Sequence, residues 1–333
     1  MKILITGGTG SFGTKMIEKM IDSDEVDVIR VFSRDEKKQH DMRVKFNSPK
    51  IEFFIGDIRD KESVSRGIEG MDTIFHAAAL KQVPTGEFFP EEMIKTNING
   101  ASNLISAVRL NGNIKKVILL STDKAVFPIN TMGLSKAVAE KLFQAAAKTS
   151  KETIFNVVRY GNVMASRGSV IPLFAQKIIS DSVLPITDPD MTRFLLSLDD
   201  AIDLVLYAIK NGKQGDTFVR KAPSVTVATL AEAMGMVFNK KIKTEIIGPR
   251  AGEKKHETLL TSAELSRAEE QEHYFRVLPE TENLAYDKFY SQGVQYVPQS
   301  DFTSESTKIL NTDETIVLLK TLDFIKELEN TRI

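Results

Sequence analysis

The stretch Lys2-Ile3-Leu4-Ile5-Thr6-Gly7-Gly8-Thr9-Gly10-Ser11-Phe12-Gly13 decides the fold of this chain. Residues 2–6 are mostly apolar and predict a short strand, and an amphipathic helix is expected from Thr14 to Ile21. The glycine spacing suits a tight turn whose backbone approaches a pyrophosphate at a helix N-terminus. Glycine-rich turns alone are a weak indication, but this strand–turn–helix context predicts dinucleotide binding. The candidate contacts are Gly7, Thr9, Gly10, Ser11, Phe12 and Gly13.

The composition limits the function classes. The 333 residues allow two domains or one large one, and 44 Lys plus Arg nearly balance 45 Asp plus Glu. We therefore expect neither nucleic acid nor a membrane as a partner. The absence of cysteine excludes disulfides and thiolate metal sites, and no metal site is predicted. No apolar run approaches the ~18 residues of a membrane span, so we expect a cytoplasmic protein.

Short apolar runs recur along the first half of the chain, and segments of helical pattern alternate with them. These runs predict strands at 28–32, 51–55, 73–75, 116–120 and 153–158. Alternation of this kind builds a doubly wound parallel sheet, so the expected fold class is α/β with a Rossmann architecture.

The pattern changes after Tyr160, which sets the expected domain boundary. Residues 1–160 would form the dinucleotide-binding domain, with segments near 192–212 returning to it. Residues 161–333 would form a smaller, partly interleaved α/β substrate domain and a C-terminal tail. The second half is expected to contain helices at Val170–Ser180, Leu198–Asn211 and Val227–Phe238 and a strand at Lys243–Ile247. The amphipathic tail, Asp313 to Leu328, could contact a second subunit or cover the sheet.

The end of the second strand bears on the choice of cofactor. Binders of NAD usually place an acid there for the ribose 2′-hydroxyl. This chain has Ser33 and Arg34, with Lys37 a turn later. A guanidinium beside the 2′ position favours a 2′-phosphate, so the sequence predicts NADP, and NAD is the alternative because Asp35 is adjacent. A charged, solvated helix face would explain the same residues without a cofactor.

Two further strand ends add candidate cofactor contacts. Asp57, next to Ile58, could accept a hydrogen bond from the adenine amino group or cap the helix that starts near Lys61. His76 follows the fourth strand, and we interpret it as a hydrogen-bonded structural residue. Small residues after it let a backbone approach the ribose and the nicotinamide: Ala77, Ala78 and Ala79.

The stretch Ser121-Thr122-Asp123-Lys124 comes directly after the fifth strand. Open α/β sheets bind ligands beside the carboxyl ends of their strands, so an acid and an ammonium group are expected in the crevice. Lys136 lies in the following helix, four residues after Met132 and on the same face. The alternative for Asp123 and Lys124 is a surface ion pair, worth about 0–1 kcal/mol.

These residues belong to longer motifs: TGGTGSFG, FSRDEKK, FFIGD, HAAALKQVP, STDKA, PIN, RYGNV, SRGSVIPLF, ITDPDMTRF and GEKKHE. Through them the chain resembles, nearly end to end, the extended short-chain dehydrogenases/reductases. More narrowly, it is similar to the UDP-N-acetylglucosamine 4,6-dehydratases that invert C5. The similarity is strongest to those that begin UDP-N-acetyl-L-fucosamine synthesis for capsule and O-antigen.

The resemblance implies elimination of water from UDP-N-acetylglucosamine, giving UDP-2-acetamido-2,6-dideoxy-β-L-arabino-hex-4-ulose. It assigns the C5 proton to Lys124 and the protonation of the leaving 6-hydroxyl to Asp123. A lysine acts as a base only if its pKa is lowered, and we expect an apolar, closed site beside Lys136 to lower it. Whether C3 is also epimerised stays open.

One position departs from the superfamily pattern. Most members have Tyr-x-x-x-Lys where this chain has Met132 and Lys136, and a thioether cannot exchange a proton at neutral pH. The fucosamine-pathway enzymes share the methionine, so we expect activity, with the 4-hydroxyl proton going to Lys136, Lys124 or water. One rival is a UDP-sugar 4-epimerase, which needs no acid at the 6-hydroxyl. Another is a catalytically silent protein that binds NADP and UDP-sugar, and only Met132 supports it.

The resemblance also assigns the remaining binding residues. On the cofactor side they are Asn97, Ser121, Lys136 and Tyr160. On the UDP-sugar side they are Lys81, Asn162, Arg167, Gly168, Ser169, Val170, Thr187, Arg193, Arg250 and Glu253. The arginines suit this role because a guanidinium can grip a diphosphate at two oxygens. The relatives further imply a homo-oligomer, either a dimer or a hexamer.

Overall fold

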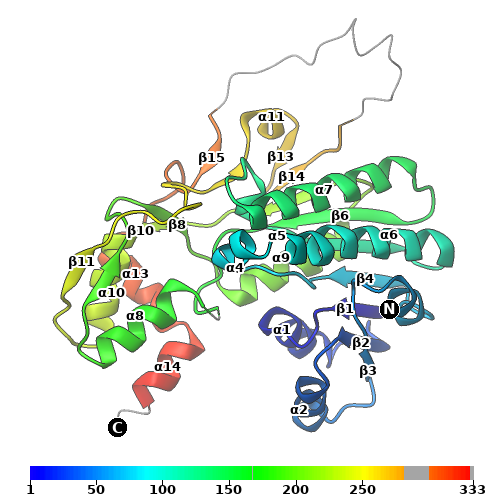
Figure 1. Ribbon diagram of the computed structural model, residues 1–333, viewed down its shortest axis with the longest axis horizontal. Coiled ribbons are helices and arrows are strands. Elements are labelled where there is room, and N and C mark those ends of the chain that lie inside the picture. Colours follow the sequence, from blue (N-terminus) through cyan, green and yellow to red (C-terminus); the bar gives the residue numbers. More distant parts are fainter. Residues whose placement is uncertain (167, 281–299, 331–333) are drawn as a thin grey trace, which may run out of the picture.

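A computed structural model describes residues 1–166, 168–280 and 300–330 (Figure 1). Within them, the main feature is a nine-stranded sheet of order β13-β14-β9-β6-β5-β4-β1-β2-β3. Its parallel part consists of β1 (Lys2–Thr6), β2 (Val28–Ser33), β3 (Ile51–Ile55), β4 (Thr73–His76), β5 (Lys116–Leu120), β6 (Ile154–Arg159) and β9 (Thr217–Arg220). The predicted α/β fold with a doubly wound parallel sheet is confirmed.

Helices bury both faces of this sheet, which is why its strands read as apolar runs. Leu4 packs in a core with α3 (Lys61–Gly67), α6 (Gly100–Asn111) and α7 (Thr131–Thr149). Its neighbours Ile3 and Ile5 point to the opposite face, because side chains alternate along a strand. That face carries α1 (Ser11–Met20), α2 (Glu36–Phe46) and α9 (Leu198–Asn211). The domain boundary at residue 160 stays a prediction.

Two antiparallel strands extend the sheet beyond β9. β14 (Tyr274–Val277) pairs with β9, and β13 (Ala268–Glu270) pairs with β14. The sequence analysis did not predict them, because runs of three or four residues are too short to show a strand's alternation.

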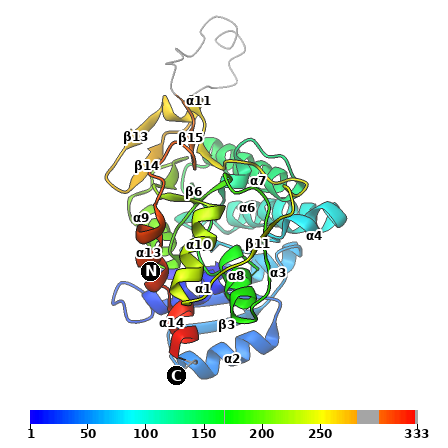
Figure 2. The same ribbon diagram turned by 90° about the vertical axis from the view of Figure 1, so that its left-hand side faces the viewer.

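A second lobe packs beside the sheet, and both views show α8 next to α10 (Figure 2). Its core is formed by α8 (Val170–Ile179), α10 (Val227–Val237), α13 (Thr312–Lys320), α14 (Asp323–Asn330) and β7 (Leu184–Ile186). The exposed strand β11 (Thr244–Ile246) pairs with β7. The tail helices α13 and α14 bury Leu319 and Ile325 completely in this core. The tail therefore covers the second lobe and not the sheet.

Three smaller groups of elements complete the described chain. β8 (Thr192–Phe194) pairs with β10 (Ser224–Thr226), and β12 (Thr258–Leu260) pairs with β15 (Phe302–Thr303) beside α11 (Ser262–Leu265). The 3₁₀ turn η2 (Asp123–Ala125) follows β5. After β4 come α4 (Val83–Phe88), α5 (Pro90–Met93) and the π-helix η1 (Ile94–Asn99). None of the described helices is long and apolar enough to cross a membrane.

Candidate active site

The turn after β1 depends on its glycines, which allow close approaches of the backbone. Gly7 has φ +68°, and a Cβ there would meet the backbone of Ala78 at 2.9 Å. A Cβ on Gly13 would lie 2.4 Å from the Cα of Gly8, so this glycine lets α1 pack against the turn. Gly10 is the N-cap of α1 and places no side chain over the helix N-terminus. This cradle fits a pyrophosphate, as the sequence predicts.

The polar side chains at the end of β2 differ in how fully they are already hydrogen-bonded or ion-paired within the protein. Ser33 is buried, and its hydroxyl accepts a hydrogen bond from Gln39 at 3.1 Å. Asp35 is the N-cap of α2, where it accepts from the Lys38 backbone at 3.0 Å and pairs with the Lys38 ammonium at 2.8 Å. Arg34 is half-exposed, with a guanidinium nitrogen 3.5 Å from Asp57. The Asp35 carboxylate is thus occupied in capping α2, whereas the Arg34 guanidinium lies beside the end of β2.

The structure shows which contacts the side chains of Asp57 and Ile58 make. The Asp57 carboxylate is held by Arg59 at 2.9 and 3.0 Å, and Asp60 caps α3 through the backbone of Glu62 at 2.9 Å. The interpretation of Asp57 as the helix cap is therefore wrong. The Ile58 side chain lies in the core, so a cofactor could meet only its backbone.

The segment after β4 is fixed by buried hydrogen bonds. The His76 ring bonds the Thr6 hydroxyl at 2.7 Å, and burial, with a smaller effect of Lys136, lowers its pKa to about 3. Asn97, in the π-helix, donates to the Leu80 carbonyl at 2.9 Å and to the Ser135 hydroxyl at 2.8 Å. It therefore fastens the β4 loop to α7, and a π-turn at such a position is common at functional sites.

Lys136 projects from the first turns of α7 to the carboxyl end of β5. Its Nζ donates to the Leu120 carbonyl at 2.5 Å, and burial lowers its pKa to about 8, against an opposing effect of Glu140. Ser121 follows directly, and its buried hydroxyl has no hydrogen-bond partner. Met132 is also buried, one turn before Lys136.

The acid and the ammonium after β5 form a buried cluster with a third residue. The Lys124 Nζ lies 3.1 Å from the Asp123 Oδ1 and 3.2 Å from the Glu257 Oε1. Asp123 is 0% exposed and Glu257 is 3% exposed, so the alternative of a surface ion pair is wrong. The Asp123 Oδ2 and Glu257 Oε2 atoms are buried without hydrogen-bond partners. Such orphaned oxygens are costly unless a ligand satisfies them.

The charge state of Lys124 differs from the expectation. Burial alone would lower its pKa, but the carboxylates of Asp123 and Glu257 more than offset that effect and raise it. The expectation of a lowered lysine pKa is therefore contradicted in this structure. The reason is Glu257, which the sequence analysis did not place beside Lys124.

Tyr160 lies close to the cluster but cannot replace the tyrosine that Met132 displaces. Its ring stacks on Phe12 with the centroids 5.6 Å apart, and its carbonyl accepts from the Asp123 backbone at 3.2 Å. Burial and the Asp123 charge raise the pKa of its phenol well above the usual range. The neutral Tyr160 phenol can line the site but is poorly suited to act as a base.

Three predicted sugar-side residues already make contacts within the protein. Arg193, on β8, donates to the Thr192 carbonyl at 2.7 Å and the Lys255 carbonyl at 3.2 Å. Arg250 is exposed and lies 3.8 Å from Glu253. Thr187 donates to the Met191 sulfur at 3.5 Å.

The loop before α8 approaches the loop after β4. Gly168 has φ +76°, and a Cβ on it would lie 2.8 Å from the Gln82 amide, one residue after Lys81. Ser169 is the N-cap of α8, which begins at Val170. The Ser169 hydroxyl and the Asn162 side-chain oxygen are buried without partners. Arg167 lies outside the described residues, and no contact is assigned to it.

Glu257 and Lys254 are the residues that the sequence analysis missed. Both belong to the quoted GEKKHE motif, but a charged run usually indicates a solvated face. Lys254 donates to the Val126 carbonyl at 2.5 Å, and its pKa is lowered by burial. Within the described chain, no group of three or more potential metal ligands is gathered.

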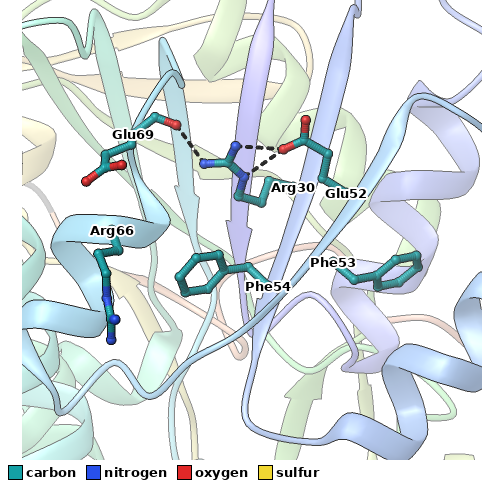
Figure 3. A pocket seen from close by; sticks show the side chains of 6 residues that line it. All are labelled: Arg30, Glu52, Phe53, Phe54, Arg66 and Glu69. Atoms are coloured by element: carbon teal, nitrogen blue, oxygen red, sulfur yellow. Dashed lines mark hydrogen bonds and ion pairs between the residues drawn. The ribbon is translucent and has the colours of Figure 1, made fainter.

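A hollow at the sheet edge has no part in this site. It encloses about 550 Å³ and is lined by residues of β2, β3 and the segment from α3 to β4 (Figure 3). Its Arg30 guanidinium is already bound by Glu52 at 2.6 Å and by the Glu69 carbonyl at 2.7 Å. None of the predicted site residues lines it, and we assign it no ligand.

Comparison with known proteins shows the family. The family described as "Polysaccharide biosynthesis protein" matches residues 3–279, and "Polysaccharide biosynthesis protein C-terminal" matches residues 281–326. The chain belongs to this family, whose place is among the extended short-chain dehydrogenase/reductase enzymes that modify nucleotide sugars.

The names of the individual relatives include both a 4-epimerase and a 4,6-dehydratase. A protein of Rickettsia bellii (strain RML369-C) named UDP-glucose 4-epimerase is 51% identical over 98% of this chain and 97% of its own length. The X-ray structure of Pen from Bacillus thuringiensis has a TM-score of 0.86 and 35% identity, covering 96% of this chain and 97% of that one. DesIV of Streptomyces venezuelae, a dTDP-glucose 4,6-dehydratase with NAD bound, has a TM-score of 0.70 at 20% identity, covering 76% and 86%, and shows the fold alone.

Proposed function

We propose that this enzyme is a UDP-N-acetylglucosamine 4,6-dehydratase that inverts C5 and uses NADP. The observation that carries the proposal is the buried cluster of Asp123, Lys124 and Glu257 at the carboxyl end of β5. Elimination of water needs one group to take a proton from C5 and another to protonate the leaving oxygen at C6. An acid and a lysine side by side, with orphaned carboxylate oxygens, supply both kinds of group.

The glycine turn of Gly7, Gly10 and Gly13 would hold the pyrophosphate of the dinucleotide, whose nicotinamide would supply a hydride acceptor for C4 of the sugar and a hydride donor for C6. The 4-ketone makes the C5 proton acidic. Lys124 first passes its own proton to Asp123, whose Oδ1 lies 3.1 Å from Nζ, and then takes the proton from C5. Asp123 gives a proton to the 6-hydroxyl, which leaves as water when the C6–O bond breaks. Lys136, whose pKa burial lowers to about 8, is the group we propose for the 4-hydroxyl proton. A proton returning to the opposite face of C5 then inverts that centre.

NADP is proposed from the groups at the end of β2. Asp35 is engaged in capping α2, so it is poorly placed to bind a ribose 2′-hydroxyl. Arg34 is half-exposed and offers the cation that a 2′-phosphate requires. The DesIV structure contains NAD, so NAD remains the alternative for this chain.

A UDP-sugar 4-epimerase is the second candidate, and the relatives' names favour it. The Rickettsia bellii protein, at 51% identity, is called a UDP-glucose 4-epimerase. Epimerisation shares the oxidation at C4 but returns the hydride to C4 on the other face. It makes no use of an acid at the 6-hydroxyl, so the buried Asp123–Lys124 pair supports the dehydratase.

Mass spectrometry of the nucleotide sugar after incubation with the protein and NADP separates these functions. A dehydratase gives a product lighter by one water, with a 4-ketone that absorbs in alkali, whereas an epimerase gives an isomer of unchanged mass. The Asp123→Asn variant should lose elimination by about 10²-fold or more. The matched control is Asp181→Asn, at a 79% exposed side chain paired with Lys240, which should keep full activity. Unchanged UDP-N-acetylglucosamine that still binds would indicate the silent binding protein.

A further inference from the structure

A loop of the second lobe is fastened onto the catalytic loop of the first. The Asn130 amide donates to the Gly252 carbonyl at 2.9 Å, and the Lys254 Nζ donates to the Val126 carbonyl at 2.5 Å. Each contact joins a residue of 248–257 to a residue between β5 and α7. The loop therefore has a defined position over the end of β5.

These two hydrogen bonds help to place Glu257 beside Lys124. The Glu257 backbone is held on both sides by Ser304: its N–H donates to the Ser304 hydroxyl at 2.9 Å, and its carbonyl accepts from the Ser304 N–H at 2.8 Å. Its Oε1 lies 3.2 Å from the Lys124 Nζ, and its Oε2 is buried without a hydrogen-bond partner. These contacts hold the Glu257 carboxylate in a fixed position within the site.

The charges that face Lys124 come from several elements. Asp123, on η2, and Glu257, just before β12, both favour its ammonium form, and Arg193, on β8, opposes it. Lys254 lies 3.9 Å from Glu257 and interacts unfavourably with Lys124. The second lobe thus supplies one of the two anions that hold the proton on Lys124.

We propose that Glu257 is a positioning residue that sets the protonation state of Lys124 for proton transfer at C5. The proposal rests on the dehydratase function. While Glu257 is charged and in place, Lys124 stays an ammonium, and it accepts the C5 proton only after its own proton has left. The lobe that holds the sugar therefore controls when the lysine becomes a base. The proton count balances, because the proton that leaves Nζ passes to Asp123, which gives it to the 6-hydroxyl, and one proton then arrives at Nζ from C5.

The first test reads Lys124 directly and needs no activity. The Lys124 resonance of protein labelled with [ε-¹³C]lysine is assigned by its loss in Lys124→Arg and is followed through pH. In Glu257→Gln it should titrate about one pH unit or more below the wild-type midpoint, because an anion within ~4 Å is removed. In Lys254→Gln it should titrate above that midpoint, because a cation is removed. Glu305→Gln, at a 66% exposed side chain, is the control and should leave the midpoint unchanged.

An unchanged Lys124 midpoint in Glu257→Gln would overturn the proposal. If that variant does not fold, Glu257→Asp takes its place: its shorter side chain holds the carboxylate further from Lys124, so a downward shift supports the proposal and an unchanged midpoint overturns it. The second test is the pH profile of kcat, whose rising limb should move to lower pH in Glu257→Gln by the same amount. A merely structural role would lower kcat at every pH without moving the limb. If the wild-type protein eliminates no water, the proposed function fails, but the titration still decides the role of Glu257.

Discussion

At the scale of single residues, the burial of His76 makes the stability of the fold depend on pH. Its folded pKa is about 3, whereas an unfolded histidine titrates near ~6.5, so the unfolded chain takes up the proton first as pH falls. The stability that the neutral ring contributes is complete above ~6.5 and is lost as pH falls towards 3. The loss is about 1.4 kcal/mol per pH unit.

We therefore predict a difference between the wild type and His76→Gln in urea unfolding. Between pH 7.5 and 5.5 the wild type should lose about 1.4 kcal/mol more free energy of unfolding than the variant. Only this pH-dependent part is compared, because the glutamine also changes the bond to Thr6. An equal pH dependence in both proteins would mean that His76 is not held neutral.

Arg34 is the residue that should set cofactor preference. Arg34→Asp should weaken NADPH binding relative to NADH by at least about tenfold, or ~1.4 kcal/mol, measured by fluorescence titration. Lys37→Gln is the matched control, because Lys37 is 82% exposed and already paired with Asp41, and its effect should be smaller. A wild-type protein that prefers NADH would contradict the assignment of NADP.

At the scale of elements, the glycine turn depends on the closeness of α1 to the end of β1. A methyl group on Gly13 would lie 2.4 Å from Gly8, so Gly13→Ala must move the helix. We predict a loss of about 1–3 kcal/mol in the free energy of unfolding, together with weaker dinucleotide binding. Lys15→Ala, on the same helix, should change stability by no more than about 0.5 kcal/mol. Equal stability of both variants would show that the contact is not tight.

The sequence was informative where a pattern runs through a whole element. The strands from β1 to β6 fall at the predicted runs, because the strands of a sheet covered by helices are mainly apolar. Between α5 and α6 the chain forms the π-helix Ile94–Asn99, which was not predicted because its wider turn leaves no mark in helical periodicity. The raised pKa of Lys124 also escaped prediction, because it depends on Glu257, whose burial comes from a contact between lobes.

At the scale of the whole molecule, Arg159 joins the sheet to both α7 and α11. It lies at the end of β6, fully buried, and bonds Glu140 at 2.8 Å and Glu264 at 2.9 Å. Arg159→Met would leave the buried carboxylate of Glu140 and the partly buried one of Glu264 without their cation, so we predict a loss of about 3–5 kcal/mol in the free energy of unfolding.

Chemical unfolding measures this loss, and Lys221→Met is its control. Lys221 pairs at 2.7 Å with Glu270, whose side chain is 70% exposed, so its removal should cost no more than about 1 kcal/mol. Similar losses in the two variants would mean that the buried network adds nothing beyond a surface pair. The homo-oligomer stays a prediction, which light scattering of the purified protein tests.

Elimination across C5 and C6 with inversion at C5 can be observed directly by proton NMR of UDP-N-acetylglucosamine incubated with the protein and NADP in D₂O. We predict a new C6 methyl resonance without coupling to a C5 proton, because solvent deuterium enters at C5, and ring couplings of the L-arabino configuration. A spectrum that shows only the 4-epimer, with hydrogen retained at C5, would contradict the roles given to Asp123 and Lys124.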